Sequence, residues 1–377
     1  MSAPSYLKMS EANDKGVFAM FGKMMNSYYY GKSGKGDFQK EDLPHNRWQL
    51  FWAMLRVRFA SLSRMNLMVL PVFIPLMGVL LVNGLRGMQV LNLAVGFQQS
   101  IEQGTELGEE YTEEIIAMFQ TAPYYADGVF NLAAFGRDIL QSILMHVMIW
   151  LIPCILITGP VEAGIAYVLR NWARDEHAFI WSDFKDAVTD NWKQGLGISA
   201  ITSVMPVIVY ISWQFYGSMA EKSVFYLVPQ MLIIILGVLW SLALIFAYPL
   251  MVTYQMSFTQ LIKNSIVLGI GRLPQSVGIR LLTLVPMALC LALFLFTGVG
   301  MYGLLVLGGY YILIGLTLHR FIYASFSNAV FDRFINSRLE GVRVNRGLAE
   351  DDEEYEDEEE EHEAGETAEP ARDQEEN

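Results

Sequence analysis

The sequence is poor in charged residues and in cysteine. Only 17% of its 377 residues are charged, whereas soluble domains carry about 25%. The two cysteines, Cys154 and Cys290, lie inside apolar runs, where a free cysteine behaves as a small hydrophobic residue. The sequence has no CxxC pair and no Cys/His cluster, so it offers no ligand set for zinc, haem or an iron–sulfur centre. These shortages exclude a soluble enzyme of ordinary composition and a disulfide-stabilised secreted domain.

Motifs of hydrolases and nucleotide-binding proteins are also missing. The sequence contains no GxSxG, no HExxH and no GxxxxGK[ST], which mark nucleophile, zinc and phosphate sites. Glu162 and Asp183 have no companion histidine or metal-binding pattern. We therefore expect no catalytic residue, no metal site and no cofactor, and we expect that the protein is not an enzyme.

Long apolar runs dominate what is present. Hydrophobic residues make up 53% of the sequence, and several runs reach the roughly 20 residues that a helix needs to cross a bilayer. We predict an all-α, polytopic membrane helix bundle with about six transmembrane helices. The predicted spans cover residues 66–85, 139–158, 196–215, 226–253, 281–299 and 302–319.

Ionisable residues are rare at the predicted membrane depth. The central parts of spans three to six contain no Asp, Glu, Lys, Arg or His, although transporters driven by ions or protons usually carry such residues there. His146 lies in the second span and His319 at the end of the sixth. A hydrogen bond to a neighbouring helix explains each histidine more simply than a proton relay. A proton-coupled transporter is therefore disfavoured.

Basic residues predict the orientation of the spans, because loops on the cytoplasmic side are enriched in Lys and Arg. If both termini are cytoplasmic, 23 of the 26 basic residues lie inside. Only Arg86, Arg137 and Lys222 then lie outside. We therefore predict that both termini are cytoplasmic.

We expect three regions along the chain. Residues 1–65 form a cytoplasmic and interfacial segment, 66–349 form the transmembrane bundle, and 350–377 form a disordered acidic tail. The tail holds 17 acidic residues against one arginine, so the rest of the chain carries a net charge of +3 despite the overall −13. Such a tail cannot bury enough apolar surface to fold alone. A tether for a basic cytoplasmic partner is the alternative, and nothing here implies binding to nucleic acid.

The longest segment between spans is 86–138, on the predicted outer side. It contains eight acidic residues, and the apolar residues Ile115, Ile116 and Phe119 beside its glutamates predict a short amphipathic helix. The segment is either an extracytoplasmic lid or docking surface, or a solvated spacer. We favour the spacer.

Several segments on the predicted cytoplasmic side have the composition of amphipathic helices that lie in the membrane interface. A weak pattern also recurs from Phe184, from Phe258 and from Phe326. It indicates either internal duplication or a shared environment, and we favour the environment. The amphipathic segments are 48–63, 161–174 and 183–195.

The end of the second span combines a proline with small residues. Pro160 should break or kink the helix after Gly159, and small residues let a neighbouring helix approach closely. We interpret Gly159, Pro160, Ala163 and Gly164 as a structural elbow. Acidic and aromatic residues at this elbow and in the amphipathic segments are candidates for contacts with a partner. They are Glu162, Asp183, Phe184, Trp192, Phe258 and Phe326.

From this elbow the chain resembles a known family. The sequence Thr158-Gly-Pro, the following Ala-Gly pair with Tyr167–Arg170, and Trp181–Phe184 are similar to the YesL-like family of bacterial membrane proteins. The run from Tyr28 to Arg58 is similar to the front end of larger clostridial-type relatives. The resemblance implies a multi-pass protein of the bacterial cytoplasmic membrane. It also implies a role beside carbohydrate ABC importers and polysaccharide use, without established catalytic residues.

Three functions compete. We favour a non-catalytic accessory or regulatory subunit of a carbohydrate ABC importer, in contact with membrane lipid and with other membrane subunits of that importer. The alternative is a transporter or permease for a small neutral solute such as an oligosaccharide. A permease of that kind should carry an EAA-x3-G loop, but Val168 stands where the loop glycine belongs. An intramembrane enzyme is disfavoured because nucleophile and metal sets are missing.

Overall fold

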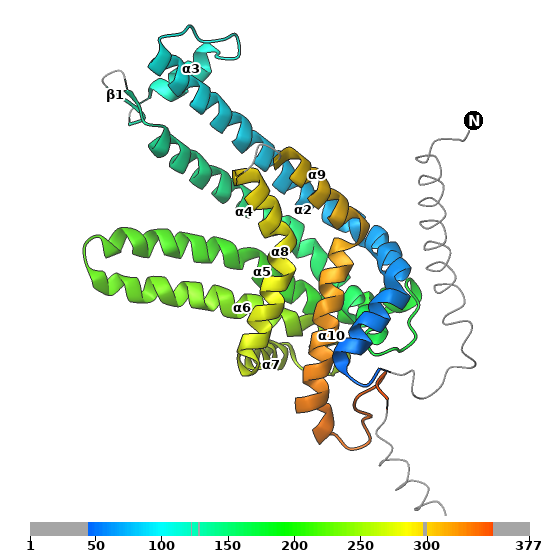
Figure 1. Cartoon of the computed structure of the whole chain (residues 1–377). Coiled ribbons are helices and arrows are strands. Elements are labelled where there is room, and N and C mark those ends of the chain that lie inside the picture. Colours follow the sequence, from blue (N-terminus) through cyan, green and yellow to red (C-terminus); the bar gives the residue numbers. More distant parts are fainter. Residues whose placement is uncertain (1–43, 122, 127–128, 297–299, 350–377) are drawn as a thin grey trace, which may run out of the picture. The chain divides into compact units, whose positions relative to one another are not determined.

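The computed structural model describes residues 44–121, 123–126, 129–296 and 300–349, and these residues are almost entirely helical (Figure 1). Within them, six helical segments are long and apolar enough to cross a membrane. The chain is therefore a multi-pass membrane protein, and the predicted all-α class is confirmed. The six segments are α2 (Arg47–Gln103), α4 (Leu132–Trp172), α5 (Ser182–Ala220), η2 (Val224–Tyr226) with α6 (Leu227–Thr253), α8 (Leu273–Phe296), and α9 (Gly300–Tyr310) with η3 (Tyr311–Gly315) and α10 (Leu316–Phe334).

The helices extend well beyond the predicted spans. The segment 48–63 lies at the beginning of α2. Residues 161–172 of the segment 161–174, and the segment 183–195, belong to the ends of α4 and α5 that adjoin their connecting loop. These three segments, predicted as amphipathic helices in the membrane interface, are thus helical, but they are continuous with the spanning helices. Their mixed composition marks the ends of long helices that continue past the apolar run. The predicted region boundary at residue 65 likewise falls inside α2, and the acidic tail 350–377 lies outside the described residues.

A short separate helix, α7 (Phe258–Gly271), follows α6. It begins with a capping box, in which the Ser257 hydroxyl accepts a hydrogen bond from the Gln260 backbone and the Gln260 side chain accepts one from the Ser257 backbone. This exchange satisfies two backbone donors that a helix start leaves free. The chain can therefore end α6 at Thr253 and begin a new helix five residues later.

Of the break or kink expected at Pro160, the break does not occur, because α4 runs unbroken from Leu132 to Trp172. A proline inside a helix leaves the carbonyl four residues earlier without its usual donor. Here that carbonyl belongs to Leu156, and the Ser199 hydroxyl of α5 donates to it at 2.9 Å. A neighbouring helix thus supplies the missing hydrogen bond, as is common for prolines in membrane helices.

Glycines hold α4 and α5 in close contact at this point. A Cβ atom built on Gly159 would collide with the backbone carbonyl oxygen of Gly195 and with the Ser199 hydroxyl. A Cβ atom on Gly164 would lie 2.6 Å from a ring carbon of Phe184 and 2.7 Å from a methyl group of Val188. The small residues therefore form a helix-packing seam between α4 and α5 and not a bend between two helices.

The described part of the segment 86–138 is folded into a cap. It contains α3 (Glu113–Gln120), close to the predicted amphipathic helix, and a short hairpin of β1 (Tyr125–Ala126) and β2 (Val129–Phe130). Figure 1 shows these elements at the far ends of α2 and α4. Their aromatic rings pack at centroid distances of 5.0 to 5.7 Å around a buried centre. The buried residues are Ala94, Phe97, Phe119, Phe130 and Phe135.

The described chain divides into two compact units. The larger comprises 61–172 and 177–328 and contains the cap and most of the long helices. The smaller gathers the start of α2, residues 173–176 and the chain after residue 328. Inside this smaller unit the Arg47 guanidinium pairs with the Asp332 carboxylate. The same carboxylate accepts hydrogen bonds from the Asn345 backbone and, at 2.5 Å, from the Asn336 side chain, so a single buried acid joins the two ends of this unit.

Within the larger unit, a turn of π-helix interrupts the last spanning segment. The π-helix η3 leaves backbone groups without their regular helical partners, and the fully buried side chain of Asn66 in α2 satisfies them. Its amide donates to the carbonyls of Tyr311 at 2.9 Å and Ile312 at 2.8 Å. Its oxygen accepts from the Thr317 backbone at 3.0 Å. These hydrogen bonds connect α2 to the junction between η3 and α10.

We expect Asn66→Leu, which keeps the branching of the side chain but removes its polar groups, to destabilise the fold by about 1–3 kcal/mol, because it leaves buried backbone groups without partners. The measurement is the melting temperature in a mild detergent. Asn83→Leu is the matched control, since Asn83 is also buried in α2 but, within the described part of the chain, its side chain bonds only to the Val79 carbonyl of its own helix. Equal melting temperatures for the two variants would contradict the proposed role of Asn66.

Candidate functional site

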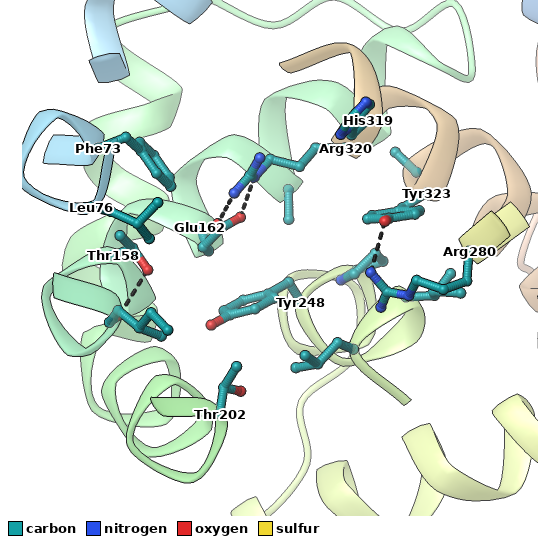
Figure 2. A pocket seen from close by; sticks show the side chains of 16 residues that line it. Phe73, Leu76, Thr158, Glu162, Thr202, Tyr248, Arg280, His319, Arg320 and Tyr323 are labelled. Carbon is teal, nitrogen blue, oxygen red and sulfur yellow. Dashed lines mark hydrogen bonds and ion pairs between the residues drawn. The ribbon is translucent and has the colours of Figure 1, made fainter. Parts of the chain in front are cut away.

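A polar cavity of about 290 Å³ lies among α2, α4, α5, α6, α8 and α10, within the larger unit (Figure 2). Apolar side chains such as Phe73 and Leu76 of α2 line part of its wall. The rest of the wall carries hydroxyl groups, a histidine and three charged groups, which converge from helices far apart in the sequence. These polar residues are Thr158, Glu162, Thr202, Tyr248, Arg280, His319, Arg320 and Tyr323.

Glu162 of α4 and Arg320 of α10 form a two-point ion pair at this cavity. The Arg320 Nε donates to one Glu162 carboxylate oxygen at 2.5 Å, and its Nη2 donates to the other. A guanidinium and a carboxylate match in this fork-to-fork geometry, which makes the pair directional as well as strong. Arg320 also lies 5.0 Å from the ring centre of Phe73, and its Nη1 donates to the Leu316 carbonyl at 2.7 Å. The pair joins α4 to α10 and is held in one orientation.

Arg280 of α8 faces the same cavity with different partners. Its Nη1 donates to the Tyr323 hydroxyl at 2.9 Å, and its Nη2 donates to the backbone carbonyl of Ser241. Its guanidinium also lies 5.2 Å from the centre of the Tyr323 ring, which is within cation–π range. Thr283 holds the Tyr323 hydroxyl from the other side at 2.9 Å. All the partners of Arg280 are thus electrically neutral.

Neutral hydrogen-bonding groups complete the site. Figure 2 shows Tyr248 lying across the middle of the cavity, with Glu162 and Thr202 on either side of it. The Tyr248 hydroxyl has no hydrogen-bond partner among the residues that the structure describes. The Nε2 of His319 lies 2.9 Å from the Tyr310 hydroxyl, so the ring is held beside the π-helix. The side chains around Tyr248 are engaged by other residues, so the Tyr248 hydroxyl is the group that remains available to a ligand.

The six residues predicted to contact a partner do not come together. Glu162 is the only one in the cavity. The Asp183 carboxylate accepts from the Phe179 backbone at 2.9 Å and lines a separate acidic hollow with Asp186 and Asp190. Trp192 is 48% exposed, with the Lys193 ammonium 5.7 Å from its ring centre.

The three phenylalanines of that set serve helix packing. Phe184 fills the space beside Gly164, and Phe258 lies against Gly197 in the same way, 2.8 Å from where a Cβ atom would stand. Phe326 packs on Phe246 with ring centres 5.6 Å apart. These residues connect the helices of this chain to one another.

Sequence reasoning missed Arg280, Arg320, Tyr248 and Tyr323 as site residues. It named Glu162 only as a candidate for contacts with a partner, because no companion for a catalytic or metal site was visible nearby in the sequence. One signal was present, since Arg280 directly precedes the predicted fifth span and Arg320 directly follows the sixth. Opposite charges at the ends of different spans on one predicted side of the membrane can meet. Their partners could be identified only from the packing of the helices.

The arrangement is suited to binding a polar molecule. It offers guanidinium and hydroxyl donors, carboxylate and hydroxyl acceptors, and aromatic faces, which small-molecule sites combine in this way. Among the described residues, no group of three or more His, Cys, Asp or Glu side chains could hold a metal ion.

Residues 139–213, about a fifth of the chain, match a family described as "Protein of unknown function, DUF624". This is the family of the YesL-like proteins, so the resemblance is confirmed over most of α4 and α5. The match includes the packing seam between these helices and Glu162. No curated protein and no solved structure matches the chain.

Proposed function

We propose that the protein is a non-catalytic accessory or regulatory subunit of a carbohydrate ABC importer in the bacterial cytoplasmic membrane. In this function the cavity around Tyr248 binds a small polar molecule, and the bound state is passed to the importer subunits through the helices that line the cavity. Other membrane subunits of the importer are the proposed partners. A basic cytoplasmic protein is the proposed partner of the acidic tail.

The observation that carries this proposal is the cavity with its held ion pair and free hydroxyl. Six helices contribute to its wall, so a molecule bound there contacts α4, α8 and α10 at once. The Glu162–Arg320 pair already connects α4 to α10. A ligand that favours one packing of these helices can shift their equilibrium by the difference in its affinity for the two packings. That is the property a regulatory subunit needs.

Purification from the native membrane in a mild detergent tests the proposal. Mass spectrometry should identify subunits of a sugar ABC importer that remain bound to the tagged protein. Cells that lack the gene should take up the corresponding sugar more slowly. A protein that purifies without importer subunits, in cells whose sugar uptake is unchanged by the deletion, would contradict the accessory role.

A transporter for a small neutral solute is the second candidate, because the same cavity could be a midway binding site. A single measurement distinguishes the transporter from the accessory subunit. Purified protein reconstituted alone into liposomes should move radiolabelled oligosaccharide if it is a transporter. An accessory subunit should show no uptake above that of empty liposomes.

The proposed orientation has both termini in the cytoplasm. We expect single cysteines introduced at the exposed positions Lys222 and Glu106 to react with a membrane-impermeant maleimide in intact cells. A cysteine at exposed Lys263 should react only after the membrane is opened. The native cysteines are buried and should give little background. Labelling with the opposite preference would overturn the orientation.

A further inference from the structure

We infer that the cavity takes a ligand with a single negatively charged oxyanion group, a carboxylate or a phosphate, which lies against Arg280. This inference deepens the proposed function and rests on it for the use of the cavity as a binding site. It begins from the charges in the wall. Two arginines and one glutamate face the cavity. Both carboxylate oxygens of the glutamate accept hydrogen bonds from Arg320.

Arg280 is therefore left without a counter-charge among the residues that the structure describes. Its partners are a tyrosine hydroxyl, a backbone carbonyl and the face of the tyrosine ring. No described carboxylate lies within ion-pair distance of it, and its Nε is buried without an acceptor among the described residues. A guanidinium stays charged and has five N–H donors, so most of its donors remain unused.

A charge in such a position is costly for the fold. A partly buried ion without a counter-charge loses part of its hydration, and neutral partners make up for only some of that loss. Chains keep such a group where it serves function, and perturbed charges in clefts are candidates for functional sites. Arginine is also the residue best suited to a planar or tetrahedral oxyanion, because its fork of N–H groups meets two oxygens at once. In this inference, an oxyanion group of the ligand supplies the negative charge that Arg280 lacks.

The surroundings of Arg280 set the size and character of the ligand. A cavity of about 290 Å³ lies at the lower end of small-molecule sites, which span about 300–1,000 Å³. The free hydroxyl of Tyr248 can bond a second polar group of the ligand. The apolar wall at Phe73 and Leu76 can cover its carbon skeleton. A compact molecule with one oxyanion and further hydroxyl groups satisfies all three features.

Such an oxyanion has two sources, a soluble molecule or the headgroup of an anionic lipid. In the predicted topology Arg280 and Arg320 lie directly at the ends of spans, which is headgroup depth. The chemistry at Arg280 is the same in both cases. The test therefore has one arm for each source.

The soluble arm compares glucuronate with glucose, two sugars that differ in a carboxylate, and adds inorganic phosphate. Each is titrated into the detergent-purified full chain, with the melting temperature and isothermal calorimetry as readouts. We expect glucuronate or phosphate to raise the melting temperature and glucose to have at least tenfold weaker effect. The lipid arm compares nanodiscs of phosphatidylglycerol with nanodiscs of phosphatidylcholine. If the headgroup is the ligand, stabilisation occurs with phosphatidylglycerol and soluble anions compete with it.

Arg280→Gln separates a binding role from a structural role. We expect this variant to lose at least tenfold in anion affinity, and to melt at the same or a higher temperature than the wild type without ligand, because an uncompensated charge is removed. Arg280→Lys should keep part of the affinity, since it keeps the charge and loses the fork. Lys263→Gln, at an exposed position of α7, is the control and should bind as the wild type does.

Equal effects of glucose and glucuronate, together with unchanged binding by Arg280→Gln, would overturn the inference. The same inference fails if Arg280→Gln melts far below the wild type and Arg280→Lys binds the anion no better than Arg280→Gln does. Arg280 then has a structural role. Neither outcome contradicts the proposed association with an importer, which is measured separately by purification and sugar uptake. Loss of that association with intact anion binding would instead overturn only the proposed function.

Discussion

Replacing Glu162 with glutamine should lower the melting temperature more than any other single substitution in the cavity. The side chains of Glu162 and Arg320 are 13% and 21% exposed, so the loss of the carboxylate charge leaves Arg320 largely buried without a counter-charge. Removing one partner of a buried ion pair typically costs about 3–5 kcal/mol. Two uncompensated arginines would then face one small cavity. Thermal unfolding in detergent, followed by circular dichroism, measures the effect.

A double-mutant cycle identifies the source of this loss. Glu162→Gln combined with Arg320→Gln should recover much of the stability, because no charge is then left alone, and the coupling between the two sites is the signature of a direct pair. Asp186→Asn is the control, since Asp186 is an exposed acid at the start of α5. Additive effects of the two cavity substitutions would show that the pair does not stabilise the fold.

Gly159→Ala should be nearly as damaging, although it adds a single carbon. Its Cβ would meet the Gly195 carbonyl and the Ser199 hydroxyl, so α4 and α5 must move apart. Overpacking of this kind costs typically about 1–3 kcal/mol and occasionally more. We expect a value near the top of that range, because the obstacle includes backbone and no rotation of a side chain removes it. Moving the helices apart also lengthens the hydrogen bond from Ser199 to the Leu156 carbonyl.

Two further glycine substitutions set the scale for this result. Gly164→Ala should be milder, because its Cβ meets side-chain atoms of Phe184 and Val188, which can shift by rotation. Gly78→Ala in α2 should be neutral or slightly stabilising, since no atom lies within 4 Å of the added carbon and alanine favours helices over glycine. Melting temperatures in one detergent should fall in the order Gly78→Ala, Gly164→Ala, Gly159→Ala. A Gly159→Ala variant as stable as the wild type would show that the seam is not closely packed.

The sequence by itself determined the number of spanning helices and the fold class. Apolar runs of sufficient length specify these properties locally, because each backbone group in a spanning helix bonds within its own segment. The short amphipathic helix in 86–138 was visible for a similar reason, since its pattern is contained in a few neighbouring residues. The packing of small residues at Gly159 and Gly164 was also anticipated, although not the helix against which they lie.

Tertiary structure alone decided what Pro160 does and where the charges meet. Proline normally breaks a helix, and here α4 continues because Ser199, 43 residues after Leu156, bonds the carbonyl that the proline leaves free. Glu162 and Arg320 are 158 residues apart, and in the sequence each is only a charge at the end of an apolar run. Hydropathy determines which segments cross the membrane. Contacts between helices determine which polar groups find hydrogen-bond partners inside the membrane. The polar residues around the cavity at Tyr248 are held by such contacts.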